Sequence, residues 1–170
     1  VDGHKWLNVP YDSGVTLVRE PDHLRAAMSI SAAYLPDAAV REPYDYTPEC
    51  SRRMRATEIW AVLASLGQAG LADLIETCCR QASMLAEGLA GAGYAVLNEV
   101  RLNQVMVSFG DDERTARVIE GLQADGTAWC GGTHWHGRAA MRISFSSHAT
   151  TDADVAKTLA AILRVARSNR

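Results

Sequence analysis

Apolar residues recur at helical spacing through the middle of the chain. Residues at this spacing lie on one face of a helix. They are Ile59, Val62, Leu63, Leu66, Leu71, Leu74, Ile75, Cys78, Ala82, Leu85 and Leu89. Thr47 and Pro48 are typical of a helix start, as the capping residue and the first helical residue. Gly67 and Gly70 interrupt the pattern, and Gly91-Ala92-Gly93 ends it. We therefore predict a long, interrupted helical passage that joins a larger domain to a smaller one.

The first third of the chain has shorter patterns. Residues 15–19 read VTLVR and alternate around β-branched side chains, which predicts a strand. Glu20-Pro21-Asp22 is typical of the start of a short helix, because proline is favoured in a first helical turn. Residues 29–46 hold two prolines and three tyrosines without a sustained period. This predicts a long loop, and long loops in compact proteins are often functional.

The last third of the chain alternates between strand and helix periods. The patterns predict strands at residues 94–98, 104–109, 127–130 and 139–146, and helices at residues 111–124 and from Thr151 onward. Thr151 and Asp154 form a weak variant of the capping box. These elements predict an α+β layer in which helices cover one face of a sheet.

Composition and charge narrow the class of partner. The chain has 170 residues, 48% hydrophobic and 22% charged, with a net charge of −3, so it has no basic surface for nucleic acid or for an anionic membrane. The longest apolar runs, such as WAVLASLG, are shorter than a bilayer span requires. The four cysteines form no C-x-x-C pair, which favours free thiols in a cytoplasmic protein. We expect a small-molecule partner.

One lysine near the start, Lys5, lies between a histidine and a tryptophan in the segment VDGHKWLNVPYDSG. A lysine beside a tryptophan is usually a surface residue whose aliphatic stem covers the ring. The segment from Asp2 to Gly14, however, resembles the D-x-H-K-W-L segment and following turn of the group II pyridoxal-phosphate-dependent amino-acid decarboxylases. The resemblance continues in the segments AYL at 33–35, SRRMR at 51–55 and MRISFS at 141–146.

This resemblance implies a fold. The chain is expected to be the C-terminal part of a fold-type-I pyridoxal-phosphate-dependent transferase fold, α/β with an α+β small domain. Residues 1–50 would end the large cofactor-binding domain, residues 51–92 would form long connecting helices, and residues 93–170 would form the small domain. The family is homodimeric, and it places further cofactor contacts upstream of the lysine. We therefore expect the chain to be the back half of a larger protein, or to be complemented by a separate N-terminal half.

The resemblance also implies roles for four residues. Lys5 would form the internal aldimine with pyridoxal 5′-phosphate, and His4 would help to hold the phosphate. Tyr34, in the predicted loop, would protonate the intermediate after carbon dioxide leaves, and Arg142 would bind the substrate carboxylate. From the residues alone, two alternatives stay open: His4 as an ordinary turn histidine, and Tyr34 as a ring packed at the base of the loop.

Other readings remain open for the chain and for its remaining polar groups. Arg52, Arg53 and Arg55 suit either salt bridges or a phosphate contact. His134 and His136 have no third ligand nearby in the sequence, so no metal site is expected. The chain is equally compatible with an aminotransferase or lyase of the same fold, if Arg142 clamps a retained carboxylate. A third reading is a non-catalytic truncated fragment that acts as a dimerisation or scaffold domain.

Overall fold

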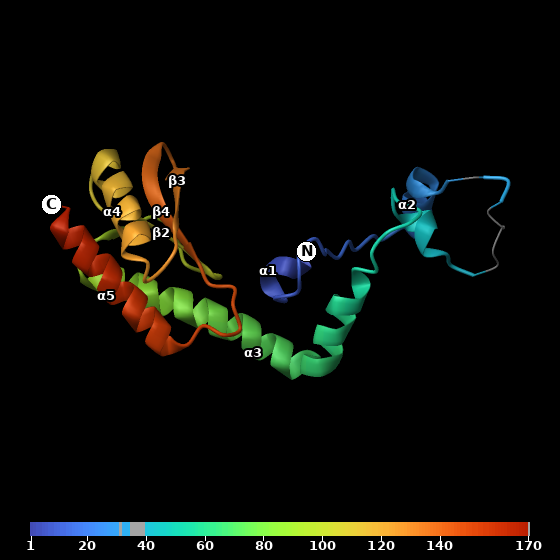
Figure 1. Ribbon diagram of the computed structural model, residues 1–170, viewed down its shortest axis with the longest axis horizontal. Helices are drawn as coiled ribbons and strands as arrows, with labels where there is room; N and C mark the ends of the chain where they lie inside the picture. The colour runs from blue at the N-terminus through green and yellow to red at the C-terminus, as the bar shows by residue number, and fades with distance from the viewer. Residues whose placement is uncertain (31, 35–39, 170) are drawn as a thin grey trace. The chain divides into compact units, whose positions relative to one another are not determined.

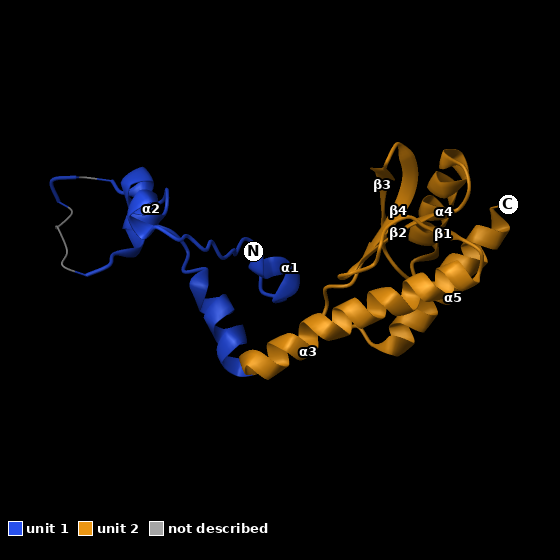
Figure 2. Cartoon of the chain, turned by 180° about the vertical axis from the view of Figure 1, so that it is seen from behind, with its two compact units in different colours: residues 1–65 blue, residues 66–170 orange. Residues whose placement is uncertain are grey.

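The chain divides into two units, residues 1–65 and residues 66–170 (Figure 2). The computed structural model describes residues 1–30, 32–34 and 40–169. The division falls inside a helix, α3 (Ala56–Gly91), which begins in the first unit and ends in the second (Figure 1). The three-part domain division that the sequence suggests stays a prediction about the complete fold.

The first unit contains short helices joined by irregular segments. They are α1 (Gly3–Trp6), α2 (Pro21–Met28), the 3-10 helix η1 (Pro43–Tyr46) and the start of α3. Pro21 is the first residue of α2, as its sequence predicts. Arg25 on α2 donates from Nε to the largely buried carboxylate of Asp45 at 3.1 Å. This ion pair joins α2 to η1.

The strand predicted at residues 15–19 is absent from the structure. Its residues are extended and mostly exposed, and Leu17 is 86% exposed. The described backbone pairing stops at Val15, which exchanges two hydrogen bonds with Val1 beside an isolated antiparallel bridge between Asp2 and Gly14. A strand requires a neighbour that accepts and donates backbone hydrogen bonds. No strand among the described residues of the first unit supplies one to residues 15–19.

The predicted helix start at Thr47 is also wrong, because α3 begins at Ala56. The Thr47 hydroxyl donates to the Glu49 carbonyl at 3.1 Å and accepts from the Arg52 guanidinium. Arg53 and Arg55, which follow in this segment, reach back to Tyr11 and Asp12. These long-range contacts hold the segment in a non-helical path.

Gly67 divides α3 as the sequence indicates, whereas Gly70 stays helical. The backbone at Gly67 has φ 61° and ψ −171°, a left-handed conformation that favours glycine. Among the described residues, α3 is the one helix long and apolar enough, by length and composition, to cross a membrane. That finding corrects the expectation that every apolar run is too short. The apolar length runs through Gly67, however, where the helix is broken.

The second unit is a four-stranded antiparallel sheet packed with helices. Its strands are β1 (Ala95–Val96), β2 (Gln104–Ser108), β3 (Gly131–Trp135) and β4 (Arg138–Ser144), in the order β1-β2-β4-β3. Helix α4 (Asp112–Asp125) packs on β4 and on α5 (Asp152–Ser168). The predicted α+β layer is confirmed in this unit.

The ends of the helices in the second unit follow local sequence signals. Thr151 and Asp154 form a complete capping box at the start of α5, as predicted. Asp111 caps α4 by accepting from the Arg114 backbone N–H at 2.7 Å. The Arg114 guanidinium donates to the carbonyls of Ala166 and Asn169, which satisfies acceptors at the end of α5.

The strand predicted at residues 127–130 is displaced in the structure. The observed strand, β3, lies immediately after these residues and begins at Gly131. β3 pairs with β4 through a tight turn at His136 and Gly137, which have φ 48° and 78°. Two positive φ angles in a two-residue turn match the twist of an antiparallel hairpin. The pairing, not the β propensity of residues 127–130, therefore sets the strand.

We predict that Leu85→Ala lowers the free energy of unfolding of the second unit by about 2–5 kcal/mol. The Leu85 side chain is 0% exposed in the α3 portion of the core, so its truncation leaves a cavity. Leu102, in the same unit, is 59% exposed, and Leu102→Ala is the matched control with a small effect. Denaturant unfolding followed by circular dichroism measures both. Equal effects of the two substitutions would contradict the described core.

Candidate functional site

Lys5 lies on α1, a single helical turn. The turn ends after Leu7 at Asn8, whose φ of 54° is tolerated by asparagine, and Asn8 Nδ2 donates to the Lys5 carbonyl at 3.3 Å. Lys5 Nζ lies 2.5 Å from Asp2 Oδ2, and its side chain is 64% exposed. The hydrogen bond and charge of Lys5 lower the pKa of Asp2 below its ordinary range. In this arrangement, Lys5 is paired with Asp2 and remains accessible from solvent.

His4 is fixed on both its ring face and its ring edge. Its ring stacks on Tyr11 with centroids 4.2 Å apart and planes at 22°. His4 Nδ1 lies 3.2 Å from the Ser13 carbonyl oxygen. Because a carbonyl only accepts, Nδ1 carries the hydrogen of this bond. The other ring nitrogen, Nε2, is therefore the one available to a ligand.

The turn at residues 10–14 supports α1. The buried Ser13 donates from its hydroxyl to the Pro10 carbonyl at 3.1 Å, and its own carbonyl accepts from the Gly3 N–H at 3.0 Å. Gly3 is closely packed, because an added Cβ would lie 3.0 Å from Ser13 Oγ and 3.3 Å from Ile59 Cδ1, so these neighbours would have to move slightly. The start of α1 thus fits closely between the turn and the first turns of α3.

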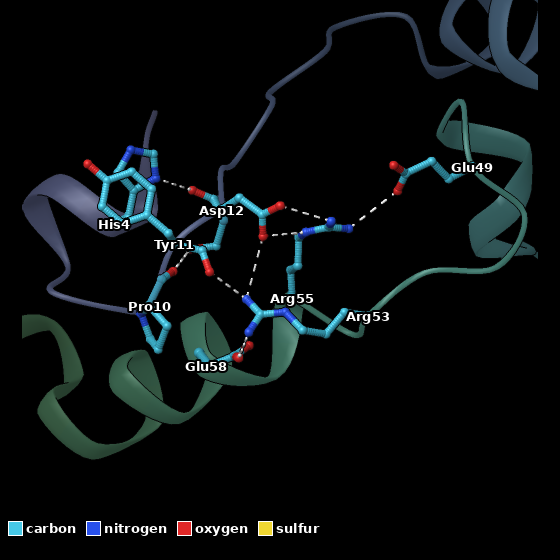
Figure 3. A network of polar contacts seen from close by, with 9 residues as sticks. His4, Pro10, Tyr11, Asp12, Glu49, Arg53, Arg55 and Glu58 are labelled. Atoms are coloured by element: carbon cyan, nitrogen blue, oxygen red, sulfur yellow. Dashed lines mark hydrogen bonds and ion pairs between the residues drawn. The ribbon is translucent and has the colours of Figure 1, made fainter.

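Arginines that precede α3 hold this turn (Figure 3). Arg55 makes a two-point contact with Asp12, from Nε at 2.8 Å and from NH2 at 3.0 Å. Arg53 donates from NH2 to the Tyr11 carbonyl at 2.8 Å. Arg55 also lies 3.3 Å from Glu49, and Arg53 lies 3.3 Å from Glu58. Arg53 and Arg55 therefore make salt bridges within the first unit.

A cleft of about 670 Å³ lies beside this network. It is lined by Asp12, Gly14, Val15, Thr16, Arg41, Thr47, Pro48, Glu49, Arg52, Arg55, Ala56 and Ile59. Arg52 donates to the Thr47 hydroxyl and to the Glu49 carbonyl, and Arg41 lies over the Tyr46 ring at 4.3 Å. Lys5 and His4 are not among the lining residues.

The other two predicted site residues lie apart from α1 in the sequence and in different surroundings. Tyr34 follows α2 and is 82% exposed, while its neighbour Leu35 lies outside the described residues. Arg142 is exposed on β4, where it is paired with Met106 and Gly131. The next residue along β3, Gly132, pairs with Met141 beside Arg142, and it faces Ile119 of α4. Since side chains alternate across a sheet, Arg142 lies on the face opposite α4.

The remaining chemistry-bearing residues give no further reactive centre among the described residues. They contain no group of three or more histidine, cysteine or acidic side chains able to hold a metal ion. All four cysteines are free. Burial raises the pKa of the Cys130 thiol to about 11 and raises that of Cys78. Both thiols therefore stay protonated, and poorly nucleophilic, near neutral pH.

Sequence reasoning missed Tyr11 and Asp12 as parts of the site. Their position in the glycine-closed turn suggested only a chain reversal. The structure shows that the Tyr11 ring and carbonyl serve different partners, His4 and Arg53. The sequence did contain one signal, namely an acidic turn residue, Asp12, and a basic segment at residues 51–55 that could pair with it.

Comparison with known proteins links residues 1–109 to a family model described as the pyridoxal-dependent decarboxylase conserved domain. The chain is 28% identical to histidine decarboxylase of Drosophila melanogaster over 168 residues, covering 95% of the chain and 20% of that protein. It is 33% identical to tyrosine decarboxylase 1 of Narcissus pseudonarcissus over 113 residues, covering 64% and 22%. The chain thus spans about a fifth of the length of these relatives.

Solved structures share the fold at low sequence identity. A crystal structure of Oryza sativa TDC with PLP and tryptamine matches with a TM-score of 0.83 and 20% identity, covering 89% of the chain and 34% of that one. Catharanthus roseus tryptophan decarboxylase in complex with L-tryptophan matches with a TM-score of 0.75 and 17% identity, covering 90% and 35%. The expected fold type I is confirmed, and the chain covers about a third of each of these structures.

We predict that Asp12 titrates at a pKa of about 2, and that Arg55→Gln moves this pKa up toward its ordinary value of 3.8. The hydrogen bonds from Arg55 are the largest cause of the lowered pKa. Because folding lowers the pKa, the pair stabilises the first unit above about pH 4 and loses this contribution as the pH falls through 2. The ¹³C shift of the Asp12 carboxyl carbon against pH measures the change. An unchanged midpoint in Arg55→Gln would contradict the two-point contact.

Proposed function

The chain belongs to the pyridoxal-dependent decarboxylase family, and we propose that it is the C-terminal portion of a pyridoxal-phosphate-dependent amino-acid decarboxylase. In this proposal Lys5 carries the cofactor, His4 contacts its phosphate and Tyr34 returns a proton to the substrate. The observation that carries the proposal is the adjacency of Lys5 and His4 on α1, within the segment that matches the family. The complete protein would be a cytoplasmic homodimer or would combine this chain with an N-terminal half.

The residues on α1 fit their share of the cofactor site. Lys5 is accessible, so its amine can reach an aldehyde. A nucleophilic amine must be uncharged, so Lys5 has to part from Asp2 before it reacts. His4 offers Nε2, and with both nitrogens protonated it donates toward a phosphate while keeping its bond to Ser13. The remaining contacts to the cofactor would come from outside this chain.

When bound, the cofactor supplies an electron sink for the bond that breaks at the substrate α-carbon. The task left to the protein is to deliver a proton to that carbon. An exposed phenol on a loop suits this task, because loop closure excludes water and brings the donor in only with substrate. Tyr34 is such a phenol in the described part of the loop. Arg142 has a planar fork that suits the substrate carboxylate.

The relatives suggest the class of substrate. Two similar proteins are named as decarboxylases of histidine and tyrosine, and one similar structure is that of a tryptophan decarboxylase. We therefore propose an amino acid with an aromatic or imidazole side chain.

The chain offers an internal control for the role of Lys5, because its only other lysine is Lys157. We predict that borohydride reduction of the protein incubated with pyridoxal phosphate leaves a stable adduct on Lys5. Peptide mass mapping locates it. Lys5→Arg should abolish the adduct, whereas Lys157→Arg, an exposed substitution on α5, should leave it intact. An adduct on Lys157 alone, or none in the complete protein, would overturn the proposal.

We predict that Tyr34→Phe keeps the Lys5 adduct but slows amine release by about 100-fold or more, the effect expected for loss of a general acid. Tyr46→Phe is the matched control, because it keeps the ring beneath Arg41. Chromatographic quantification of the amine and of any oxo acid reads out the reaction. Normal amine release by Tyr34→Phe would refute its role, and an oxo acid that retains the carboxyl group would instead indicate an aminotransferase.

A further inference from the structure

We infer that Arg53 and Arg55 are positioning residues for Lys5 and His4. We call the two guanidinium groups, with their acceptors at Tyr11 and Asp12, the arginine clamp. The inference rests on the proposed role of Lys5. It goes further, because it assigns the orientation of the lysine to two side chains that lie about fifty residues further along the chain.

The Ser13 carbonyl holds the start of α1. This one oxygen accepts from the Gly3 N–H at 3.0 Å and from His4 Nδ1 at 3.2 Å. Gly3 and His4 are the two residues that precede Lys5. A displacement of Ser13 would therefore move both neighbours, and with them the base of the Lys5 side chain.

The arginine clamp in turn holds the turn that contains Ser13. The two residues that precede Ser13 are both fixed by the clamp, Tyr11 through its carbonyl and Asp12 through its carboxylate. The Tyr11 ring in turn stacks on His4. The clamp thus reaches His4 by two routes, one through the Ser13 backbone and one through the Tyr11 ring, as Figure 3 shows.

The exposure and geometry of these contacts decide what the clamp contributes. The clamp residues are partly exposed, and exposed ion pairs contribute little to stability. A two-point contact between guanidinium and carboxylate nevertheless fixes orientation, because both hydrogen bonds need one planar geometry. Glu49, which precedes α3, contacts Arg55, and Glu58 on α3 contacts Arg53. We therefore expect the clamp to fix the orientation of the turn rather than to stabilise the fold.

The cofactor-free test uses the ring of His4. Stacking on Tyr11 places the His4 ring protons over an aromatic face, which shifts their NMR signals upfield. We expect Arg55→Gln and Asp12→Asn to lose most of this shift, and Arg55→Lys, which keeps the charge but not the planar fork, to lose part of it. The His4 signal is identified by its disappearance in His4→Asn. Arg164→Gln, which breaks an exposed pair with Asp125 in the second unit, is the matched control.

The second arm measures the initial rate at which pyridoxal phosphate becomes reducible onto Lys5 in the complete protein. We expect Arg55→Gln and Asp12→Asn to lower this rate about tenfold or more, the scale of a small misplacement of a reacting group, and Arg164→Gln to leave it unchanged. Circular dichroism confirms that each variant is folded. Arg55→Lys, expected to be intermediate in both arms, serves as the test if the other variants do not fold.

The outcomes separate the two proposals. Unshifted His4 signals in Arg55→Gln and Asp12→Asn would overturn the clamp, and so would a normal Lys5 rate in variants whose His4 signals have moved. A failure of the unsubstituted protein to form the Lys5 adduct would instead overturn the proposed function, and with it the role of the clamp toward Lys5.

Discussion

The Ser13 carbonyl oxygen is central to the placement of Lys5, because it accepts hydrogen bonds from Gly3 and His4, the two residues that precede the lysine. A helix of one turn cannot hold itself in place, because its nucleation costs more than its few hydrogen bonds return. The position of α1 must therefore come from tertiary contacts. The turn at residues 10–14 supplies them, and the arginines that precede α3 fix that turn in its place.

This arrangement explains why the segment that leads into α3 is not helical. A helical path from Thr47 would carry Arg53 and Arg55 away on the helix surface, where their charges would oppose the positive end of the macrodipole. In the observed path they instead meet the acidic and carbonyl groups of the turn. Residues 47–55 therefore stay outside the helix and instead make contacts that support α1.

Much of the fold follows from local signals, and the errors arise where long-range pairing decides. The start of α5 and the end of α3 were predictable, because the Thr151 capping box and Gly91-Ala92-Gly93 act within a few residues. β3 was misplaced because its register comes from pairing with β4. The start of α3 was misplaced because Arg55 meets a partner 43 residues away.

The candidate site divides in the same way. Lys5 and His4 could be proposed from the sequence because the segment that resembles the family is contiguous, whereas the contributions of Tyr11 and Asp12 depend on groups that meet only in the folded chain. The roles assigned to Tyr34 and Arg142 depend on the family resemblance, since the structure places them on an exposed segment and an open sheet face.

The central claim is that Lys5 is the cofactor-bearing amine, and a crystal structure of the complete protein with pyridoxal phosphate tests it most directly. The account predicts continuous density from Lys5 Nζ to the aldehyde carbon of the cofactor, with Asp2 released and His4 Nε2 directed at the phosphate. Cofactor bound elsewhere, with Lys5 still paired to Asp2, would contradict it.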